Sequence, residues 1–309
     1  MTDSPTPPES PTFSRLAWAF VGYLLFVVLF GAWVRITGSG AGCGDHWPLC
    51  DGQVVPLAPS IERIIEYTHR VTSGLCGIFS IGFVAAAVKA WGWGHRISRA
   101  AVATLLFVIV EGAIGAMLVK LELVAGDTSS TRGLVIALHL GNTLLLMGCA
   151  TLMAWLAGSG RGFVLGRAAL GAGWFLAVLG GLALTSMTGA VTALGDTVFP
   201  VGSAEAAKAA GHILVQLRIV HPVVAMTVAG VLLWFTSKML AAYVPGEARR
   251  WAKRIGWLVL VQVVFGFVNI GLAAPGWAQI VHLLIAQALW ICAVVATIAA
   301  RDAGSASAG

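Results

Sequence analysis

The sequence predicts an all-α integral membrane protein with eight transmembrane helices, arranged as two parallel-repeated four-helix bundles. Three observations carry this prediction. Of the 309 residues, 58% are hydrophobic and only 10% are charged, whereas about a quarter of the residues are charged in ordinary soluble domains. Eight apolar runs are each long enough, at about 20 residues, to cross a bilayer as a helix. Finally, short motifs recur at a constant offset along the chain.

The eight apolar runs are flanked by charged residues or by Gly, Pro and Ser, which are typical of helix ends. The first run is too long for the core of a signal peptide and has no obvious cleavage site, so we expect it to stay as a helix. The Pro- and Ser-rich residues 1–15 before it are expected to form a disordered tail. The runs cover residues 16–36, 66–90, 100–120, 133–157, 168–190, 215–241, 255–274 and 278–300.

Lys and Arg are distributed unevenly between the loops on the two sides of the predicted membrane. Because cytoplasmic loops are enriched in these residues, we expect the side with more of them, which includes both termini, to face the cytoplasm. The net charge of +6 then mainly anchors this face to membrane lipid. The composition asks for no nucleic-acid partner.

Two pairs of motifs, each 151 residues apart, indicate an internal duplication. ITGSGAGCGD (36–45) is similar to MTGAVTALGD (187–196), and VEGAIGAMLV (110–119) is similar to VQVVFGFVNI (261–270). Four helices per half is an even number, so both halves enter the membrane from the same side as a parallel repeat. The predicted parts are a tail (1–15), an N-terminal half (16–157), a cytoplasmic linker (158–167), a C-terminal half (168–300) and a cytoplasmic tail (301–309).

Every second predicted helix carries one histidine near its outer end. His69 and His221 are 152 residues apart, and His139 and His282 are 143 apart. A single histidine in a helix is more often a satisfied core residue, but four at similar depth favour metal or haem ligation, because burying them in lipid is costly. Cysteine and carboxylate ligands of a zinc or iron–oxo site are missing near three of the four. Paired imidazoles across a four-helix half suit a haem iron.

The two halves differ beside the first histidine. In IEYTHR, Glu66 precedes His69 by three residues and shares its helix face; in QLRIVHP, Arg218 holds the matching position and no acid is present. We expect Glu66 to accept a proton or to stabilise positive charge near a bound group. The alternative is a helix-start residue in interfacial water.

Three further polar residues lie on the predicted helices. Arg70 and Arg218, near the outer helix ends, are candidates to bind haem propionates, and headgroup-facing or solvated arginine is the alternative. Glu111, in the middle of its helix and opposite Gln262 in the repeat, is an acid at membrane depth and therefore a functional candidate. A hydrogen bond to a neighbouring helix is the alternative role for Glu111.

The loop GCGDHWPLC (42–50) holds two cysteines on the predicted outer side, where disulfides persist. A Cys43–Cys50 disulfide is the favoured interpretation, and two free thiols are the alternative. A metal site that also uses His46 is less favoured, because its ligand set is incomplete. The other three cysteines fall inside predicted helices and are expected to be small buried hydrophobic residues.

The stretch TGSGAGCGDHWPLCDGQVVP, followed by IEYTHRVTSG and three further helix-borne histidines, resembles the heme A synthase family over residues 16–300. The resemblance implies that heme O is converted to heme A by successive oxygenation of the C8 methyl group and loss of water, for use in aa3-type terminal oxidases. It implies that His69 and His139 hold the substrate haem, with Glu66 as the catalytic carboxylate. His221 and His282 would ligate a heme b that passes electrons.

The same resemblance implies a bacterial plasma membrane location. The expected partners are heme O and heme A, membrane lipid, a heme O synthase, cytochrome oxidase assembly factors and further copies of the chain. Family members commonly have a second cysteine pair in the matching loop of the second half, whereas residues 195–212 contain none. We therefore expect the Cys43–Cys50 pair to staple its loop instead of joining a relay through both loops.

Two other classes of protein share part of this pattern. A b-type cytochrome that transfers electrons would also use paired helix histidines, but it would not require Glu66 in one half or the cysteine loop. A transporter built from parallel repeats would share the symmetry, but it should show broken helices near the membrane midplane.

Overall fold

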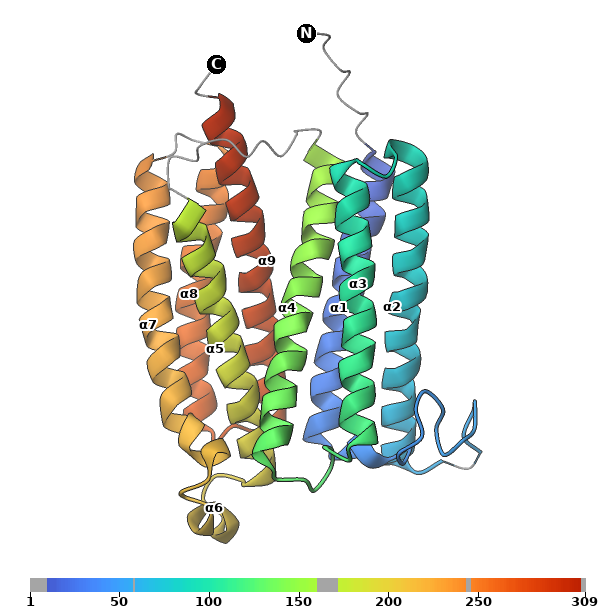
Figure 1. The fold of residues 1–309 in the computed structure, drawn as a ribbon. Coiled ribbons are helices and arrows are strands. Elements are labelled where there is room, and N and C mark those ends of the chain that lie inside the picture. The colour runs from blue at the N-terminus through green and yellow to red at the C-terminus, as the bar shows by residue number, and fades with distance from the viewer. Residues whose placement is uncertain (1–9, 58, 160–171, 243–245, 307–309) are drawn as a thin grey trace.

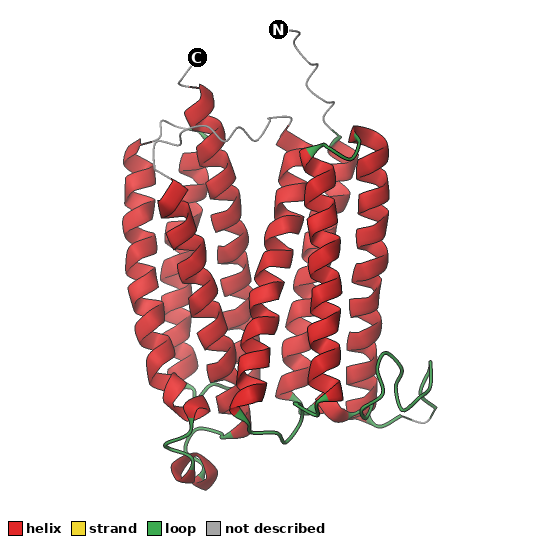
Figure 2. Cartoon of the chain, in the orientation of Figure 1, coloured by secondary structure: helices red, strands yellow, loops and turns green. Residues whose placement is uncertain are grey.

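The computed structural model describes residues 10–57, 59–159, 172–242 and 246–306, and within them it is helical with connecting loops and has no strand (Figures 1 and 2). Eight of its helices are long and apolar enough to cross a membrane. This confirms the predicted all-α, multi-pass membrane architecture. The long helices are α1 (Pro11–Ile36), α2 (Ile61–Trp91), α3 (Arg96–Lys120), α4 (Ser130–Ser159), α5 (Ala172–Val198), α7 (Ile213–Ala242), α8 (Glu247–Gly271) and α9 (Gly276–Ala306).

The helices form two groups of four, and the start of α1 and the end of α9 lie at the same end of the molecule (Figure 1). In the first group, α1 contacts α2, α2 contacts α3, α3 contacts α4 and α4 returns to α1; α5, α7, α8 and α9 form the same kind of ring. The groups meet mainly where α4 and α1 pack against α5 and α9. That the groups arose by duplication stays a prediction.

The predicted disordered tail is wrong for its last five residues, because α1 begins at Pro11. Ser10 caps this helix by accepting a hydrogen bond from the backbone N–H of Phe13. Phe13 is itself buried and packs edge-on against Trp91 at the end of α2. A capping serine and one buried aromatic ring therefore extend the helix into the Pro-rich stretch, whose first nine residues lie outside the described chain.

Several other predicted boundaries shift by one or two turns. Helix α2 begins five residues early because Ser60 caps it. Helix α5 continues eight residues past the predicted end at 190, where Val191 and Leu194 pack against Leu214 of α7. Helix α9 continues into the predicted C-terminal tail. The short helices η1 (Ser39–Ala41) and α6 (Ala204–Lys208) were not predicted, and most of the predicted linker 158–167 lies outside the described residues.

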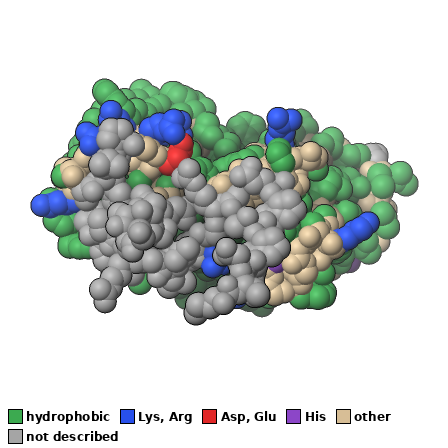
Figure 3. Space-filling model, turned by 90° about the horizontal axis from the view of Figure 1, so that it is seen from above, with side chains coloured by type: hydrophobic (Ala, Val, Ile, Leu, Met, Phe, Trp, Pro, Cys, Tyr) green, Lys and Arg blue, Asp and Glu red, His purple; other side chains and the backbone are tan. Residues whose placement is uncertain are grey.

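The end of the bundle at which α1 begins and α9 ends is tightly packed. The main cluster of buried residues occupies the parts of the long helices nearer this end, with residues such as Phe20, Met147, Phe175 and Phe235. Viewed onto this end, Lys and Arg side chains are visible at several places and acidic side chains at one (Figure 3). The opposite end has no comparable cluster among the described residues, and this leaves room for a cavity.

Candidate functional site

A cavity of about 1490 Å³ lies in the less tightly packed part of the bundle and reaches into both groups of helices. Pockets for one small molecule measure about 300–1,000 Å³, so this cavity is larger than one such ligand requires. Its lining is mostly aliphatic side chains and glycine, with few polar groups. All four histidines singled out in the sequence line it: His69, His139, His221 and His282.

The four histidines lie at similar depth. They stand 8, 9, 8 and 6 residues after the first residue of α2, α4, α7 and α9. At 1.5 Å per residue, this spread of three residues amounts to about 4.5 Å along the helix axis. His69 and His139 come from α2 and α4 of the first group of helices, and His221 and His282 come from α7 and α9 of the second. Each group of helices therefore contributes one pair of imidazoles to the cavity lining.

The ring nitrogens of these histidines are incompletely satisfied. The Nδ1 atoms of His69, His139 and His282 are buried and have no hydrogen-bond partner in the described structure. In His221, Nδ1 lies 3.2 Å from the hydroxyl of Thr188, which leaves Nε2 for another partner. Because a buried polar atom without a partner is costly, the three imidazoles with an unpartnered nitrogen, together with His221 on the same cavity, fit paired axial ligation of haem iron.

Two glycines allow the imidazoles to lie directly against neighbouring helices. A Cβ atom at Gly31 of α1 would stand 3.0 Å from Cε1 of His69, and one at Gly189 of α5 would stand 2.9 Å from Cε1 of His221. Any side chain at these positions would displace the ring. The sequence interpretation missed both glycines, because the close approach joins residues that are far apart in the chain.

Glu66 is buried, with 3% of its surface exposed, and it lines the cavity. One carboxylate oxygen accepts a hydrogen bond from Nε of Arg70 at 3.1 Å, and the other accepts the backbone N–H of Cys43 at 2.8 Å. The alternative of a carboxylate in interfacial water is therefore wrong. Glu66 stands one helical turn from His69 on the same helix, so the acid and the imidazole face one cavity.

The cysteine loop is docked on this acid. Cys43 and Cys50 form the predicted disulfide and are fully buried. Arg70, which holds Glu66, also donates to the backbone carbonyl groups of His46 and Leu49. Within the described chain, no three His, Cys, Asp or Glu side chains gather as a metal site would require. The backbone of the loop thus contacts both members of the Glu66–Arg70 pair.

The second half also contains a carboxylate–arginine pair, which the sequence interpretation missed. Asp196, at the end of α5, lies 2.6 Å from Nε of Arg218, and Arg218 also donates to the carbonyl groups of Gly195 and Phe199. The interpretation that only one half carries an acid beside its histidine pair is therefore corrected. The available signal was the Gly-Asp of the repeated motif at 187–196, which was noticed only as a marker of duplication.

Glu111 of α3 lies beside the second histidine of the first half. Its carboxylate oxygens accept hydrogen bonds from Nδ2 of Asn142 and from the hydroxyl of Thr143, both on α4. Oε1 of Glu111 also lies 3.4 Å from Nδ1 of His139. In the second half, the amide of Gln262 lies 3.1 Å from Nε2 of His282. Glu111 and Gln262, which the repeat aligns, thus each lie beside a cavity histidine.

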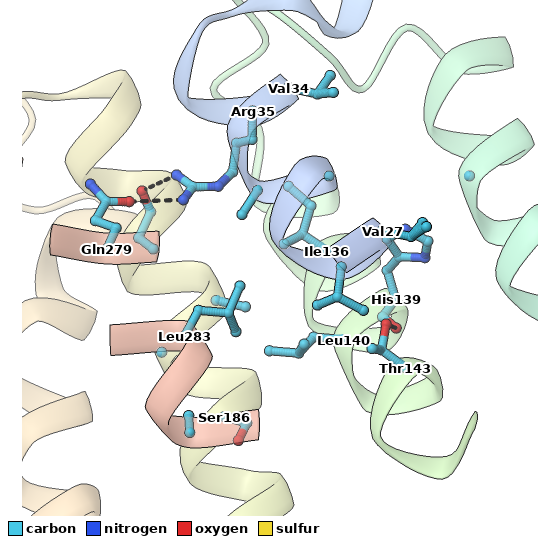
Figure 4. A pocket seen from close by; sticks show the side chains of 18 of the residues that line it. Val27, Val34, Arg35, Ile136, His139, Leu140, Thr143, Ser186, Gln279 and Leu283 are labelled. Carbon is cyan, nitrogen blue, oxygen red and sulfur yellow. Dashed lines mark hydrogen bonds between the residues drawn. The ribbon is translucent and has the colours of Figure 1, made fainter. Parts of the chain in front are cut away.

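Four arginines line the cavity, and they differ in their partners. Arg70 and Arg218 each have a carboxylate partner. Arg35 donates across the junction between the halves to Gln279 of α9, and in Figure 4 it reaches over the cavity from α1. Arg132 is 5% exposed, and its Nε has no partner. Neither Arg35 nor Arg132 is ion-paired with a carboxylate of the described residues.

This difference bears on the predicted propionate partners. A buried cation without a counter-charge is costly, so an anionic ligand would be stabilised beside Arg35 and Arg132. Arg70 and Arg218 each have a carboxylate that balances their charge, whereas Arg35 and Arg132 donate to neutral acceptors. The arginines identified from helix position are therefore internally paired, while the two without carboxylate partners were not singled out by any motif.

Similarity to known proteins agrees with this site. A relative from Thermus thermophilus, named protoheme IX farnesyltransferase, is 41% identical over 307 residues, which cover 96% of this chain and 50% of the relative. A heme A synthase of Alkalihalophilus pseudofirmus is 38% identical over 139 residues (43% of this chain, 42% of the relative). One of Geobacillus kaustophilus is 40% identical over 133 residues (43% and 39%).

The chain spans about half the length of the Thermus thermophilus relative. A model of the cytochrome oxidase assembly protein family matches residues 14–294, which include all or most of each of the eight long helices and the four cavity histidines. With this match over nearly the whole chain, the protein belongs to the COX15-CtaA family of cytochrome oxidase assembly proteins.

Proposed function

We propose that this protein is a heme A synthase, which oxidises the C8 methyl group of heme O to a formyl group. The observation that carries the proposal is the large apolar cavity, which holds two pairs of histidines and has the buried Glu66 beside one pair. The similarity to heme A synthases of Alkalihalophilus pseudofirmus and Geobacillus kaustophilus supports it.

In the first half, His69 and His139 would hold the substrate haem. Bound heme O would supply the iron and the methyl group that is oxygenated in successive steps before loss of water leaves the formyl group. Arg70 and the N–H of Cys43 keep the carboxylate of Glu66 oriented. With donors on both oxygens, Glu66 is better suited to stabilising positive charge near the reacting carbon than to moving freely as a proton carrier. The apolar walls exclude water from the methyl group.

In the second half, His221 and His282 would hold a heme b. Two imidazoles leave no open position on the iron, an arrangement that suits electron transfer. Because one cavity extends into both halves, electrons from this haem would have a short path to the substrate. Arg35 and Arg132 would neutralise carboxylate groups of the bound haems.

We further propose that the protein lies in the bacterial plasma membrane with both termini in the cytoplasm. The larger number of Lys and Arg at one end of the bundle supports this orientation. The difference between the two ends grows when arginines that are held inside the protein are not counted. Most Lys and Arg of the opposite end are held by protein acceptors: Arg35, Arg63, Arg70, Arg132 and Arg218. The Cys43–Cys50 disulfide would then face the oxidising outer compartment.

A heme O synthase is the partner best supported for this protein. The Thermus thermophilus relative is named for the transfer of a farnesyl group to protoheme IX, which is the reaction that makes heme O. The product, heme A, would pass to cytochrome oxidase assembly factors. Association with further copies of this chain stays a proposal without a structural observation behind it.

The test is expression in a bacterial host that makes heme O and lacks its own heme A synthase. Haems extracted from the membranes are separated by chromatography, and the purified protein is analysed as its pyridine haemochrome. Heme A in the extract, with heme b in the protein, is the expected result. Protein that carries heme b while heme O stays unconverted would instead identify a b-type cytochrome. Protein without any haem would overturn both assignments.

A further inference from the structure

Glu111 is an acid in the middle of α3 for which the proposed reaction has no use so far. Its side chain is 22% exposed, and the exposed surface belongs to the cavity wall. Asn142 and Thr143 of α4 donate to its two oxygens. An acid at membrane depth lowers stability, so its presence points to a function. Helix pairing alone could be achieved by a neutral amide, which would donate as well as accept.

The neighbour that gives Glu111 a function is His139. Its Nδ1 is buried and lacks a hydrogen bond, and the nearest acceptor given by the structure is Oε1 of Glu111 at 3.4 Å. The contact is slightly longer than a good N–H···O bond of about 2.9 Å. A small rotation of the imidazole would close it, because Asn142 and Thr143 hold the carboxylate in place on the same helix face as His139.

A hydrogen bond at Nδ1 determines what the other nitrogen can do. When Nδ1 carries the proton and donates it, Nε2 has its lone pair free for a metal. A carboxylate acceptor also makes the imidazole a stronger ligand and orients its ring, and such partners of metal-binding histidines matter for affinity and for metal chemistry. For haem iron, hydrogen bonding to the axial ligand is one of the few means by which a protein adjusts the reduction potential.

We propose that Glu111 is a positioning residue, which accepts a hydrogen bond from Nδ1–H of His139 and so directs Nε2 of that imidazole at the substrate haem. This inference rests on the proposed function, because it takes His139 to be a haem ligand. A carboxylate partner would also make the iron of the first half more electron-rich than two imidazoles alone.

The second half lacks this arrangement. Gln262 is neutral and lies against Nε2 of His282, and the buried Nδ1 of that histidine has no partner. Thr188, the partner of His221 in this half, is also neutral. In the described structure, a carboxylate therefore accompanies a cavity histidine at hydrogen-bonding range only at His139.

The test is a redox titration of the haem in the first half. Glu111→Gln is compared with the parent protein in a His282→Ala background, so that the haem of the second half does not contribute to the signal. We expect the midpoint potential to shift to a more positive value, because a neutral amide stabilises the ferric state less. We also expect haem affinity at this site to fall about tenfold or more. Glu111→Asp keeps the negative charge but places it farther from His139, so it should shift the potential less.

Asn142→Ala is the matched control. It removes one helix–helix hydrogen bond of Glu111, on the oxygen that does not face His139, while Thr143 still holds the other oxygen near His139. If Glu111 only joins α3 to α4, Glu111→Gln and Asn142→Ala should both lower thermal stability and leave the potential unchanged, and that result would overturn the inference. An equal positive shift in both variants would assign the effect to repacking and would overturn it as well.

Failure of the proposed function would look different. If His139→Ala retains the parent haem content, His139 is not a ligand and the proposed substrate site is wrong. If His139→Ala loses that haem while Glu111→Gln keeps the parent potential, the proposed substrate site is supported and the proposed role of Glu111 is contradicted. Should Glu111→Gln fail to accumulate, the potential of Glu111→Asp decides in the same way, since a parent value there contradicts the proposal.

Discussion

The two halves of the cavity are built from the same kinds of residue in different places. In the first half, Glu66 stands on the histidine helix and is paired with Arg70 of the same helix. In the second half, Arg218 takes the place of Glu66, and its partner Asp196 comes from the neighbouring helix. Both halves thus have an ion pair one turn from a histidine.

The residue three positions before the first histidine of each half therefore differs in the sign of its charge. A carboxylate beside His69 can stabilise positive charge on a bound group, whereas a guanidinium beside His221 cannot. The second histidines repeat the contrast, with the acid Glu111 at one and the amide Gln262 at the other. The half with an acid at both positions is the one that we propose for chemistry on the substrate, and the other half is the one that we propose for electron transfer.

The largest expected effect is the loss of one haem without loss of the other. His282→Ala removes a proposed ligand and should abolish stable heme b in the purified protein, while haem at the site proposed for His69 and His139 should remain. His139→Ala should have the reciprocal effect. Haemochrome spectra of the two purified variants check this. Unchanged heme b in His282→Ala would remove the distinction between the two halves.

The next effect separates the two acids. Glu66→Gln keeps the size of the side chain and removes its charge, so heme A formation should fall about 100-fold while both haems stay bound. Heme O or a hydroxylated intermediate should accumulate in extracts separated by chromatography. Asp196→Asn is the control, and it should leave most heme A formation intact. Equal losses in both variants would mean that the ion pairs serve structure alone.

A smaller effect is expected at the junction between the halves. Arg35→Met removes the hydrogen bonds to Thr197 and Gln279 and a cation without a carboxylate partner, so haem retention should weaken about tenfold. Arg63→Met is the matched control, because Arg63 lies at the same end of the bundle but pairs with Asp51 outside the cavity lining. Haem titration of both variants checks the prediction, and identical affinities would contradict it.

The smallest effect concerns the cysteine loop. The double variant Cys43→Ser, Cys50→Ser should still make heme A, because we expect the disulfide only to support the loop. Its stability should fall by about 2 kcal/mol, as expected for a short closed loop. Thermal unfolding and haem extraction measure the two quantities. A folded, haem-loaded double variant that makes no heme A would show that the thiols have a chemical role.

Much of the architecture could be predicted because it depends on local composition. Apolar length alone identifies membrane helices, and all eight were found. The boundaries were less accurate where a cap or a packed side chain decided them, as at Ser10 and Phe13. The four histidines could be identified because they recur at a similar place on every second helix, and this recurrence is visible in the sequence.

Residue order alone was enough to predict the helices, the depth of the histidines and the disulfide loop, because each depends on residues close together in the chain or on a repeat between its halves. Which charges meet was settled by the packing of the helices. Asp196 pairs with Arg218 from another helix, Arg35 crosses to Gln279, and Glu111 reaches His139. These contacts join residues on different helices, and their partners depend on how the helices rotate and pack, which the spacing of residues along one helix does not specify.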